Sequence, residues 1–252
     1  MRLNRRRLQQ KSSSPSPTPD DLLRELRKIQ ANQDRNFVRM QALAALYELL
    51  PLRNVLPLIP RQSGVASPVL LHRLVAEIIS RRPHQSLECG SGVSTLIGGY
   101  AIEHLGAGGK WTALEHDPAW HRRVSDWVSD HGLGDTVEVL LAPLVQHELP
   151  PPRGERLDWY DLSALRLECA AELVLVDGPP GQRNSKARLP AAYLLQPYLR
   201  DGALALIDDC RRLGEREMVE AWAKDGLLTD VSTLADAKHV TLGTLRTSVD
   251  AE

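Results

Sequence analysis

Residues 87–95 of the chain read LECGSGVST, and this stretch decides the fold. A short apolar strand runs into a glycine turn, and a helix follows directly. Gly90 and Gly92 let the backbone approach a ligand closely, while the first turn of the helix offers N–H groups that lack intrahelical partners. The pattern is typical of the ligand-binding corner of an α/β sheet.

Apolar strand-like runs alternate with helical segments on both sides of this turn. Short buried strands separated by helices are typical of a parallel, doubly wound sheet. We expect helices at residues 67–80, 94–105, 117–130, 188–199 and 214–224. We expect strands at residues 86–89, 111–115, 137–141, 173–177, 203–208, 228–233 and 239–245. The last two strands are close enough in sequence to end a seven-stranded sheet as a hairpin, with the final strand antiparallel.

The residues before this domain, which we expect to span 67–252, predict an N-terminal extension. Residues 1–19 hold a basic cluster followed by SSSPSPTP, and Ser/Pro-rich sequence predicts a disordered tail. Residues 20–50 predict a helix that ends at Pro51, and Pro- and Gly-punctuated sequence then links it to residue 66.

The 20–50 helix carries apolar residues every 3.5 positions, which favours pairing with a second copy as a coiled coil. Polar residues interrupt both registers, as they do where a seam sets its alignment. The two registers are Leu22, Ile29, Asn36, Leu43, Leu50 and Leu26, Gln33, Met40, Tyr47. The alternative is that the second half of the helix packs on the main domain. The sequence therefore predicts a homo-oligomer, with this alternative open.

Composition excludes several classes of protein. The 252 residues are 42% hydrophobic and 25% charged, which is typical of a globular chain and not of a disordered or fibrous one. Cys89, Cys169 and Cys210 lie far apart, so neither a disulfide framework nor a zinc site is expected. This cysteine usage fits a reducing, cytoplasmic location. No apolar run reaches the length of about 20 residues that a membrane span needs.

The charge distribution disfavours a nucleic-acid-binding body. Residues 1–11 hold five basic residues and no acidic one, so the rest of the chain has 26 basic against 32 acidic residues. A body with a net charge of −6 lacks the basic surface that phosphate binding requires.

Two acids near the glycine turn indicate what kind of ligand it holds. Glu88 stands two residues before Gly90, where a carboxylate would repel a pyrophosphate but suits a cofactor carrying a cation. Thr95 takes the third small position of a dinucleotide fingerprint, which weakens a nicotinamide interpretation. Glu115 ends the second strand, where a carboxylate can accept hydrogen bonds from both ribose hydroxyls of a nucleoside. His116 follows it.

Three further strand ends carry candidate site residues. Ala142 and Pro143 follow the third strand, where an adenine could lie against small side chains. The fourth strand delivers Asp177 into a Gly/Pro loop, and the fifth ends in Asp208 and Asp209. If these two strands are neighbours, the three acids meet at the carboxyl edge of the sheet.

Three roles are open for these acids. Three oxygen ligands suit Mg²⁺ or Mn²⁺. One Asp could instead serve as a general base without a metal. The acids could also be structural and pair with Arg211 or Arg212. Arg183, Lys186 and Arg188, in the loop after Asp177, could meet an anionic or sugar substrate, or be solvated.

The combined series of motifs resembles the class I S-adenosylmethionine-dependent methyltransferases. It is most similar to a bacterial branch with a VDGPPG loop and a DDxxR strand end, over about residues 67–245. The motifs, in chain order, are ECGSG at 88–92, ALEHD at 113–117, LVDGPPG at 175–181 and ALIDDCRR at 205–212. The resemblance implies a Rossmann-like methyltransferase fold.

The resemblance also implies a cofactor, S-adenosylmethionine, and its contacts. The first motif would hold the methionine end and the adenosine, and Glu115 the ribose. The implied cofactor-binding residues are Glu88, Gly90, Gly92, Ser94, Glu115, His116, Ala142, Pro143 and Asp177.

Metal-dependent O-methyltransferases of the catechol type place an Asp after strand four and an Asp-Asn pair after strand five. Their magnesium ligands correspond here to Asp177, Asp208 and Asp209, which are also the catalytic candidates. Asp209 departs from the usual Asn, which adds negative charge to the site.

The resulting function is O-methylation of a hydroxyl on a sugar, glycan or small metabolite. Two alternatives are open: a protein that keeps the fold and binds without catalysis, and a nicotinamide-dependent oxidoreductase.

Overall fold

The computed structural model describes residues 24, 27, 30, 34, 37, 40–42, 44–54, 56, 66–106, 108–181, 184–234 and 239–247. The chain divides into two units, residues 1–37 and 38–252. Every described residue from 24 to 49 is helical, which agrees with the predicted helix. The predicted tail, residues 1–19, lies outside the described residues.

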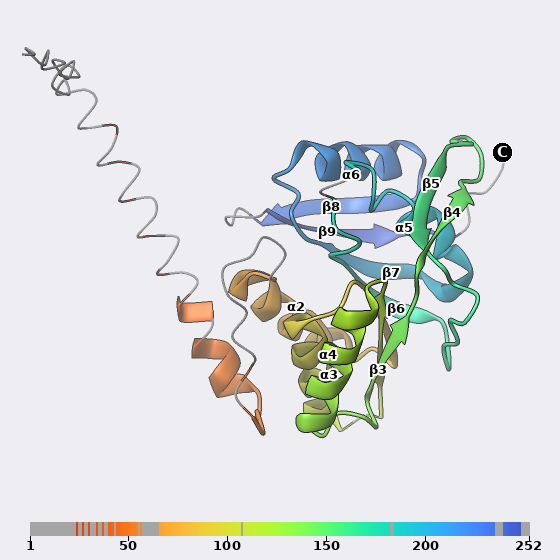
Figure 1. The fold of residues 1–252 in the computed structure, drawn as a ribbon. Coiled ribbons are helices and arrows are strands. Elements are labelled where there is room, and N and C mark those ends of the chain that lie inside the picture. Colours follow the sequence, from red (N-terminus) through yellow and green to blue (C-terminus); the bar gives the residue numbers. More distant parts are fainter. Residues whose placement is uncertain are drawn as a thin grey trace, which may run out of the picture. The chain divides into compact units, whose positions relative to one another are not determined.

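A seven-stranded sheet forms the centre of the second unit, in the order β3-β2-β1-β6-β7-β9-β8 (Figure 1). Neighbouring strands are parallel, except that β9 runs antiparallel to both β7 and β8. The strands are β1 Gln85–Cys89, β2 Lys110–Glu115, β3 Val137–Leu141, β6 Ala171–Val176, β7 Leu199–Ile207, β8 Leu228–Leu234 and β9 Val240–Leu245. The predicted doubly wound, mainly parallel sheet and its final hairpin are confirmed.

Helices cover both faces of this sheet. Three of them, α2, α3 and α4, lie together on one side, and α6 lies on the other beside β8 and β9 (Figure 1). Ser67 caps α2 by accepting a hydrogen bond from the N–H of Leu70, and Asp117 caps α4 in the same way. The helices are α2 Pro68–Arg81, α3 Val93–Leu105, α4 Pro118–Asp130, α5 Ala191–Leu194, the 3₁₀ helix η1 Gln196–Tyr198 and α6 Leu213–Lys224.

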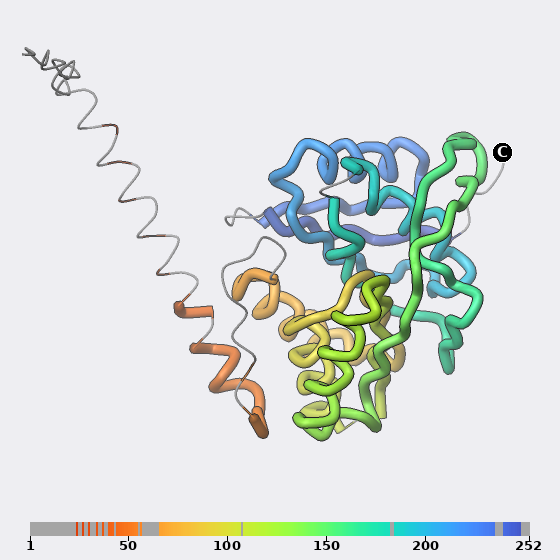
Figure 2. The backbone as a smooth tube through the Cα atoms, viewed as in Figure 1, coloured from red at the N-terminus to blue at the C-terminus, as the bar shows by residue number. Residues whose placement is uncertain are grey.

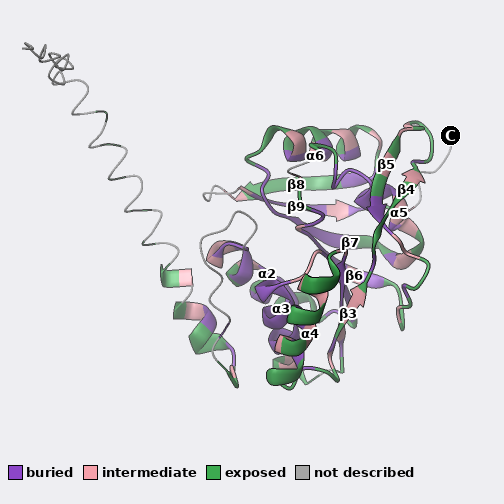
Figure 3. Ribbon diagram, in the orientation of Figure 1, coloured by how far each residue is buried: buried purple, intermediate pink, exposed green. Residues whose placement is uncertain are grey.

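The strands are buried on both faces, as a parallel sheet between helical layers requires. In β6, Leu173 and Leu175 belong to one hydrophobic core, while Val174 and Val176 belong to a second core. Side chains alternate between the faces of a strand, so the two cores lie on opposite sides of the sheet. The central strands are accordingly drawn as buried in Figure 3.

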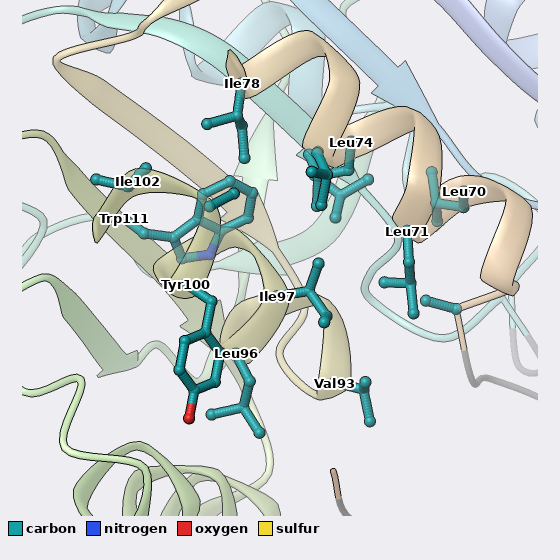
Figure 4. Packing of buried hydrophobic residues seen from close by; sticks show 14 of the residues in the cluster. Leu70, Leu71, Leu74, Ile78, Val93, Leu96, Ile97, Tyr100, Ile102 and Trp111 are labelled. Atoms are coloured by element: carbon teal, nitrogen blue, oxygen red, sulfur yellow. The ribbon is translucent and has the colours of Figure 1, made fainter. Parts of the chain in front are cut away.

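The first core joins α2 and α3 to the sheet (Figure 4). Trp111 of β2 is fully buried there, and its ring lies directly against Gly98 of α3. A Cβ atom at Gly98 would come within 2.7 Å of the indole, so glycine at this position lets the helix approach the sheet. α3 is thereby held close to β2, with its N-terminus at the glycine turn.

The segment before α2 contributes to the same core. Leu46, Leu50 and Leu56 are buried in it, whereas Met40 and Tyr47 are 70% and 49% exposed. The two registers of the predicted coiled-coil seam therefore differ at this end of the helix. Leu50 of the first register packs inside its own domain, whereas Met40 and Tyr47 of the second are exposed. Leu22, Leu26, Ile29, Gln33, Asn36 and Leu43 lie outside the described residues.

Two predictions about elements were wrong. The helix expected at 188–199 is instead a series of turns, the short α5 and η1. Pro190 and Pro197 explain this, because proline removes a backbone donor and clashes with the preceding helical turn.

A hairpin was also missed, formed by β4, Leu144–Glu148, and β5, Arg156–Tyr160. In Figure 2 this hairpin is the green segment that follows β3. Its strands are mostly exposed except for Trp159 and Tyr160, so they lack the apolar pattern that identifies a buried strand.

The three cysteines are free thiols, as the sequence predicts. None of the helices in the described parts of the chain is long and apolar enough to span a membrane.

Candidate functional site

The glycine turn after β1 packs against the loop after β6. Gly90 has a φ of +99°, which favours glycine, and the N–H of Asp177 donates to the carbonyl of Cys89 at 3.1 Å. A Cβ atom at Gly178 would lie 2.9 Å from Cα of Gly90 and would overlap the buried hydroxyl of Tyr160. Glycine at both positions thus lets the two backbones touch at the carboxyl edge of β1 and β6, and this contact of Gly90 with Gly178 is called the cradle below.

Glu88 lies in β1, two residues before Gly90, where it is buried and accepts hydrogen bonds from three side chains. Its carboxylate accepts hydrogen bonds from the hydroxyls of Ser94 and Thr95, at 2.5 and 2.7 Å. The indole N–H of Trp111 donates to it at 2.9 Å. Glu88 and Ser94 therefore bind each other and fix α3 to β1. That either one contacts a cofactor stays a prediction.

Burial raises the pKa of Glu88 to about 7, and the nearby charge of Glu115 acts in the same direction. The three donors oppose this shift, because hydrogen bonds to a carboxylate favour its charged form. Thr95 also accepts from the N–H of Gly92 at 2.9 Å. Thr95, which stands where a dinucleotide fingerprint has a glycine or alanine, thus connects the start of α3 to Glu88 through its hydroxyl.

Glu115 ends β2 beside the same cradle and is 4% exposed. Oε2 accepts from the hydroxyl of Ser91 at 2.8 Å, and Oε1 accepts from the N–H of Asp117 at 2.9 Å. Nδ1 of His116 lies 3.0 Å from Oε1. Nδ1 of His116 makes no hydrogen bond there, so two of about four lone-pair sites are used and Glu115 keeps acceptor capacity for two ribose hydroxyls.

Ala142 and Pro143 follow β3 next to Glu115. The N–H of Ala142 donates to the carbonyl of Glu115 at 2.7 Å, and the carbonyl of Pro143 accepts from Asp161 at 2.8 Å. Exposed apolar side chains flank this pair at Leu141, Leu144 and Val145. Ala142 itself is fully buried, so of the two predicted adenine contacts only Pro143 presents its side chain at the surface.

The three strand-end acids converge as the sequence predicts. β6 and β7 are parallel neighbours, and oxygens of Asp177, Asp208 and Asp209 lie within 4.8 Å of one another. Asp208 and Asp209 are buried, whereas Asp177 is partly exposed. Asp209 adopts a left-handed φ of +63°, which Asp tolerates better than most residues.

A buried arginine occupies the centre of this acid cluster. The side chain of Arg188 is 4% exposed and lies 3.1 Å from Oδ1 of Asp177 and 3.4 Å from Oδ2 of Asp209. Arg212 approaches the same Oδ2 at 2.8 Å, and it also lies 3.3 Å from Glu215. Of the two partners expected for the acids, Arg212 is therefore present, while Arg188 is an unexpected third.

These residues do not fit a divalent metal ion. Oδ2 of Asp209 already lies against two guanidinium groups, those of Arg188 and Arg212, and Asp177 shares that of Arg188. We therefore derive no step through a metal.

Sequence reasoning did not find the role of Arg188, nor Glu215, which lies 3.9 Å from it. Arg188 stands in a turn, and nothing in the local pattern separates it from Lys186, which pairs with Glu155 instead. Ser91 was also missed as the partner of Glu115, although it lies between the two glycines.

Comparison with known proteins places this geometry in a class. Residues 87–210 match the model of a methyltransferase domain family. None of the curated proteins compared with the sequence matches it.

Solved structures share the fold at low sequence identity. An S-adenosylhomocysteine-bound methyltransferase from Podospora anserina is 15% identical, with a TM-score of 0.58 over 93% of this chain and 99% of that one. An O-methyltransferase from Bacillus cereus in complex with S-adenosylhomocysteine is 15% identical, with a TM-score of 0.55 over 82% and 90%. An O-methyltransferase from Streptomyces achromogenes, involved in tomaymycin synthesis and in complex with S-adenosylmethionine, is 16% identical, with a TM-score of 0.51 over 72% and 81%.

The sheet order and these neighbours show a Rossmann-like methyltransferase fold, as the sequence predicts. The match of residues 87–210 to a methyltransferase domain family supports the resemblance to class I methyltransferases.

Proposed function

We propose that the chain binds S-adenosylmethionine at the carboxyl edge of its sheet and methylates a hydroxyl of a sugar, a glycan or a small metabolite. The observation that carries the proposal is the backbone cradle of Gly90 and Gly178 beside the buried carboxylate of Glu115. The solved neighbours that carry this cofactor or its demethylated product support it.

The residues of the cradle fit the parts of this cofactor. Glu115 would accept hydrogen bonds from the ribose hydroxyls, and the exposed side chain of Pro143, next to the buried Ala142, would receive the adenine. The methionine end would lie near the N-terminus of α3, where the Cβ position of Gly92 has no atom within 4 Å. When bound, the cofactor supplies a methyl group on a sulfonium, and its displacement by an oxygen leaves a neutral thioether.

Asp177 is the best placed residue to take the proton of the acceptor. It follows β6 directly beside Gly178, and its side chain is 10% exposed, against 5% for Asp209. An acceptor hydroxyl would lose its proton to this carboxylate as the new O–C bond forms. Holding both reactants in line contributes further, since oriented reactants avoid a large entropic barrier.

The test is mass-spectrometric detection of a methylated product from a panel of sugar and small-metabolite acceptors. We expect Asp177→Asn to lower the turnover about 10²- to 10⁴-fold. Asp158→Asn is a matched control because Asp158 lies exposed on β5.

Two results would contradict the proposal. Binding of S-adenosylmethionine without product from any acceptor favours the non-catalytic alternative. Binding of a nicotinamide nucleotide in its place favours the oxidoreductase.

We also propose that the chain self-associates through its 20–50 helix. Phe37, Met40 and Tyr47 are exposed apolar side chains on this helix, which supports pairing. Light scattering should give a multiple of the 28.0 kDa chain mass. Removal of residues 1–37 should reduce that mass while Leu46 and Leu50 stay in the core. A full-length monomer at micromolar concentration would end this proposal.

A further inference from the structure

We propose that Arg188 is the built-in cation of the strand-end acid cluster, and that the site therefore neither needs nor binds a divalent metal ion. The cluster is the set of Asp177, Asp208, Asp209 and Glu215. Arg188 acts here as a positioning residue, because it holds the carboxylates in place without contacting a substrate.

The contacts of Arg188 explain why it can replace an ion. A guanidinium has five N–H donors in a fixed plane. Nη2 donates to the carboxylate of Asp177 at 3.1 Å and to that of Asp209 at 3.4 Å, and Nη1 lies 3.9 Å from Glu215. Three acidic side chains thus meet one buried cation, which is the arrangement that a metal would otherwise supply.

Arg188 also joins the backbone of the two strand ends. Nη2 donates to the carbonyl of Asp177 at 2.6 Å, and Nη1 donates to that of Asp208 at 3.2 Å. Nε donates to the carbonyl of Pro179 at 3.4 Å. The loop after β6 and the end of β7 are therefore tied to one side chain. A guanidinium stays charged at all ordinary pH values, so this compensation is permanent.

Two of the oxygens that a metal would need already face a guanidinium group. Oδ1 of Asp177 and Oδ2 of Asp209 accept hydrogen bonds from Arg188, and Oδ2 of Asp209 also lies 2.8 Å from Nη2 of Arg212. A divalent ion binds through carboxylate oxygens at about 2.0–2.6 Å, so it would have to displace these guanidinium groups. Displacement is hindered because the side chain of Arg188 is buried under the loop it holds.

The experiment titrates Mn²⁺ alone into the full chain by calorimetry and measures the unfolding temperature in excess chelator and in millimolar Mn²⁺. For the wild type we expect no saturable Mn²⁺ binding and the same unfolding temperature in both buffers. Arg188→Gln should lower the unfolding temperature in chelator. Mn²⁺ should then restore several degrees, because the uncompensated carboxylates gain a cation.

Two controls separate the cluster from other surface acids. Arg156→Gln changes an exposed arginine that pairs with Glu148 on the β4–β5 hairpin, outside the cluster, and should leave the chain without Mn²⁺ binding. Adding Asp208→Asn to Arg188→Gln should abolish the Mn²⁺ binding that the single variant gains.

Two outcomes would overturn the proposal. The first is micromolar Mn²⁺ binding by the wild type that Asp208→Asn removes, and this result requires no Arg188 variant to fold. The second is an Arg188→Gln protein with wild-type stability and no gain of Mn²⁺ binding. Cofactor binding is measured without metal, so either failure leaves the proposed function standing.

Discussion

The two halves of the carboxyl edge bury their acids in different ways. Over β1 and β2, Glu88 and Glu115 are held by hydroxyl, indole and backbone N–H donors. Over β6 and β7, Asp177 and Asp209 are held by the guanidinium of Arg188. The same sheet thus places neutral donors in one half and a permanent cation in the other.

Neutral donors satisfy hydrogen bonds but do not cancel charge. The pKa of Glu88 accordingly stays near 7 in spite of three donors, because burial penalises the charged carboxylate. In the other half Arg188 places a positive charge directly against the carboxylates of Asp177 and Asp209. The half that lacks a built-in cation is the one where we propose that a positively charged cofactor binds.

The largest effect should come from removing the cation. Arg188→Gln leaves Asp177, Asp209 and Glu215 facing one another, and breaking a buried ion pair from one side costs about 3–5 kcal/mol of unfolding free energy. Urea unfolding measures this loss, with Arg156→Gln, which removes an exposed pair with Glu148, as a control expected to lose about 1 kcal/mol or less. A loss for Arg188→Gln no larger than that control would erase the difference between the two halves.

In the half over β1 and β2, Glu88 should make the free energy of unfolding depend on pH. The pKa of Glu88 rises from 4.5 to about 7 on folding, so the folded protein keeps a proton that the unfolded chain has lost. The free energy of unfolding should therefore fall by about 3 kcal/mol as the pH rises through this window, and then level off.

Glu88→Gln is the matched control for this effect. Its amide oxygen can accept from Thr95 and Trp111, and its NH₂ group can donate to Ser94. The difference in unfolding free energy between wild type and variant, measured at about pH 5 and about pH 8, isolates the one carboxyl group. A difference that does not change with pH would show that Glu88 ionises normally.

A smaller change should come from removing one neutral donor. Trp111→Phe keeps most of the ring that packs on Gly98 but loses the hydrogen bond to Glu88 at 2.9 Å. A hydrogen bond to a charged group contributes about 1.5–3 kcal/mol, so the free energy of unfolding of the variant above pH 7 should be lower by about that amount. Below the pKa of Glu88 the loss should be smaller, and an equal loss at both pH values would point to packing instead.

The sequence predicts the fold well where a rule is local. Strands that are apolar throughout predict a parallel sheet, and acids directly after two such strands predict a shared edge. The convergence of Asp177, Asp208 and Asp209 follows from these two facts together. The hairpin β4–β5 was missed because its exposed strands lack the apolar pattern by which a buried strand is recognised in the sequence.

The site is less predictable because its partners come from distant positions. Trp111 lies 23 residues after Glu88, and no motif connects them. Arg188 lies 11 residues after Asp177, beyond a Gly/Pro loop whose path the sequence does not determine. Which donor satisfies a buried acid is decided by tertiary packing, so the acids were found, but of their partners only Arg212 was.

The central claim is that the half of the edge over β1 and β2 binds S-adenosylmethionine through Glu115. It is tested most directly by calorimetric titration of S-adenosylhomocysteine into the wild type, Glu115→Ala and Glu138→Ala, an exposed acid on β3 that serves as control. We expect saturable binding that Glu115→Ala weakens by about 1.5–3 kcal/mol, or about 10- to 150-fold, and that Glu138→Ala leaves unchanged. No binding to the wild type, or equal affinity in Glu115→Ala, would contradict the claim.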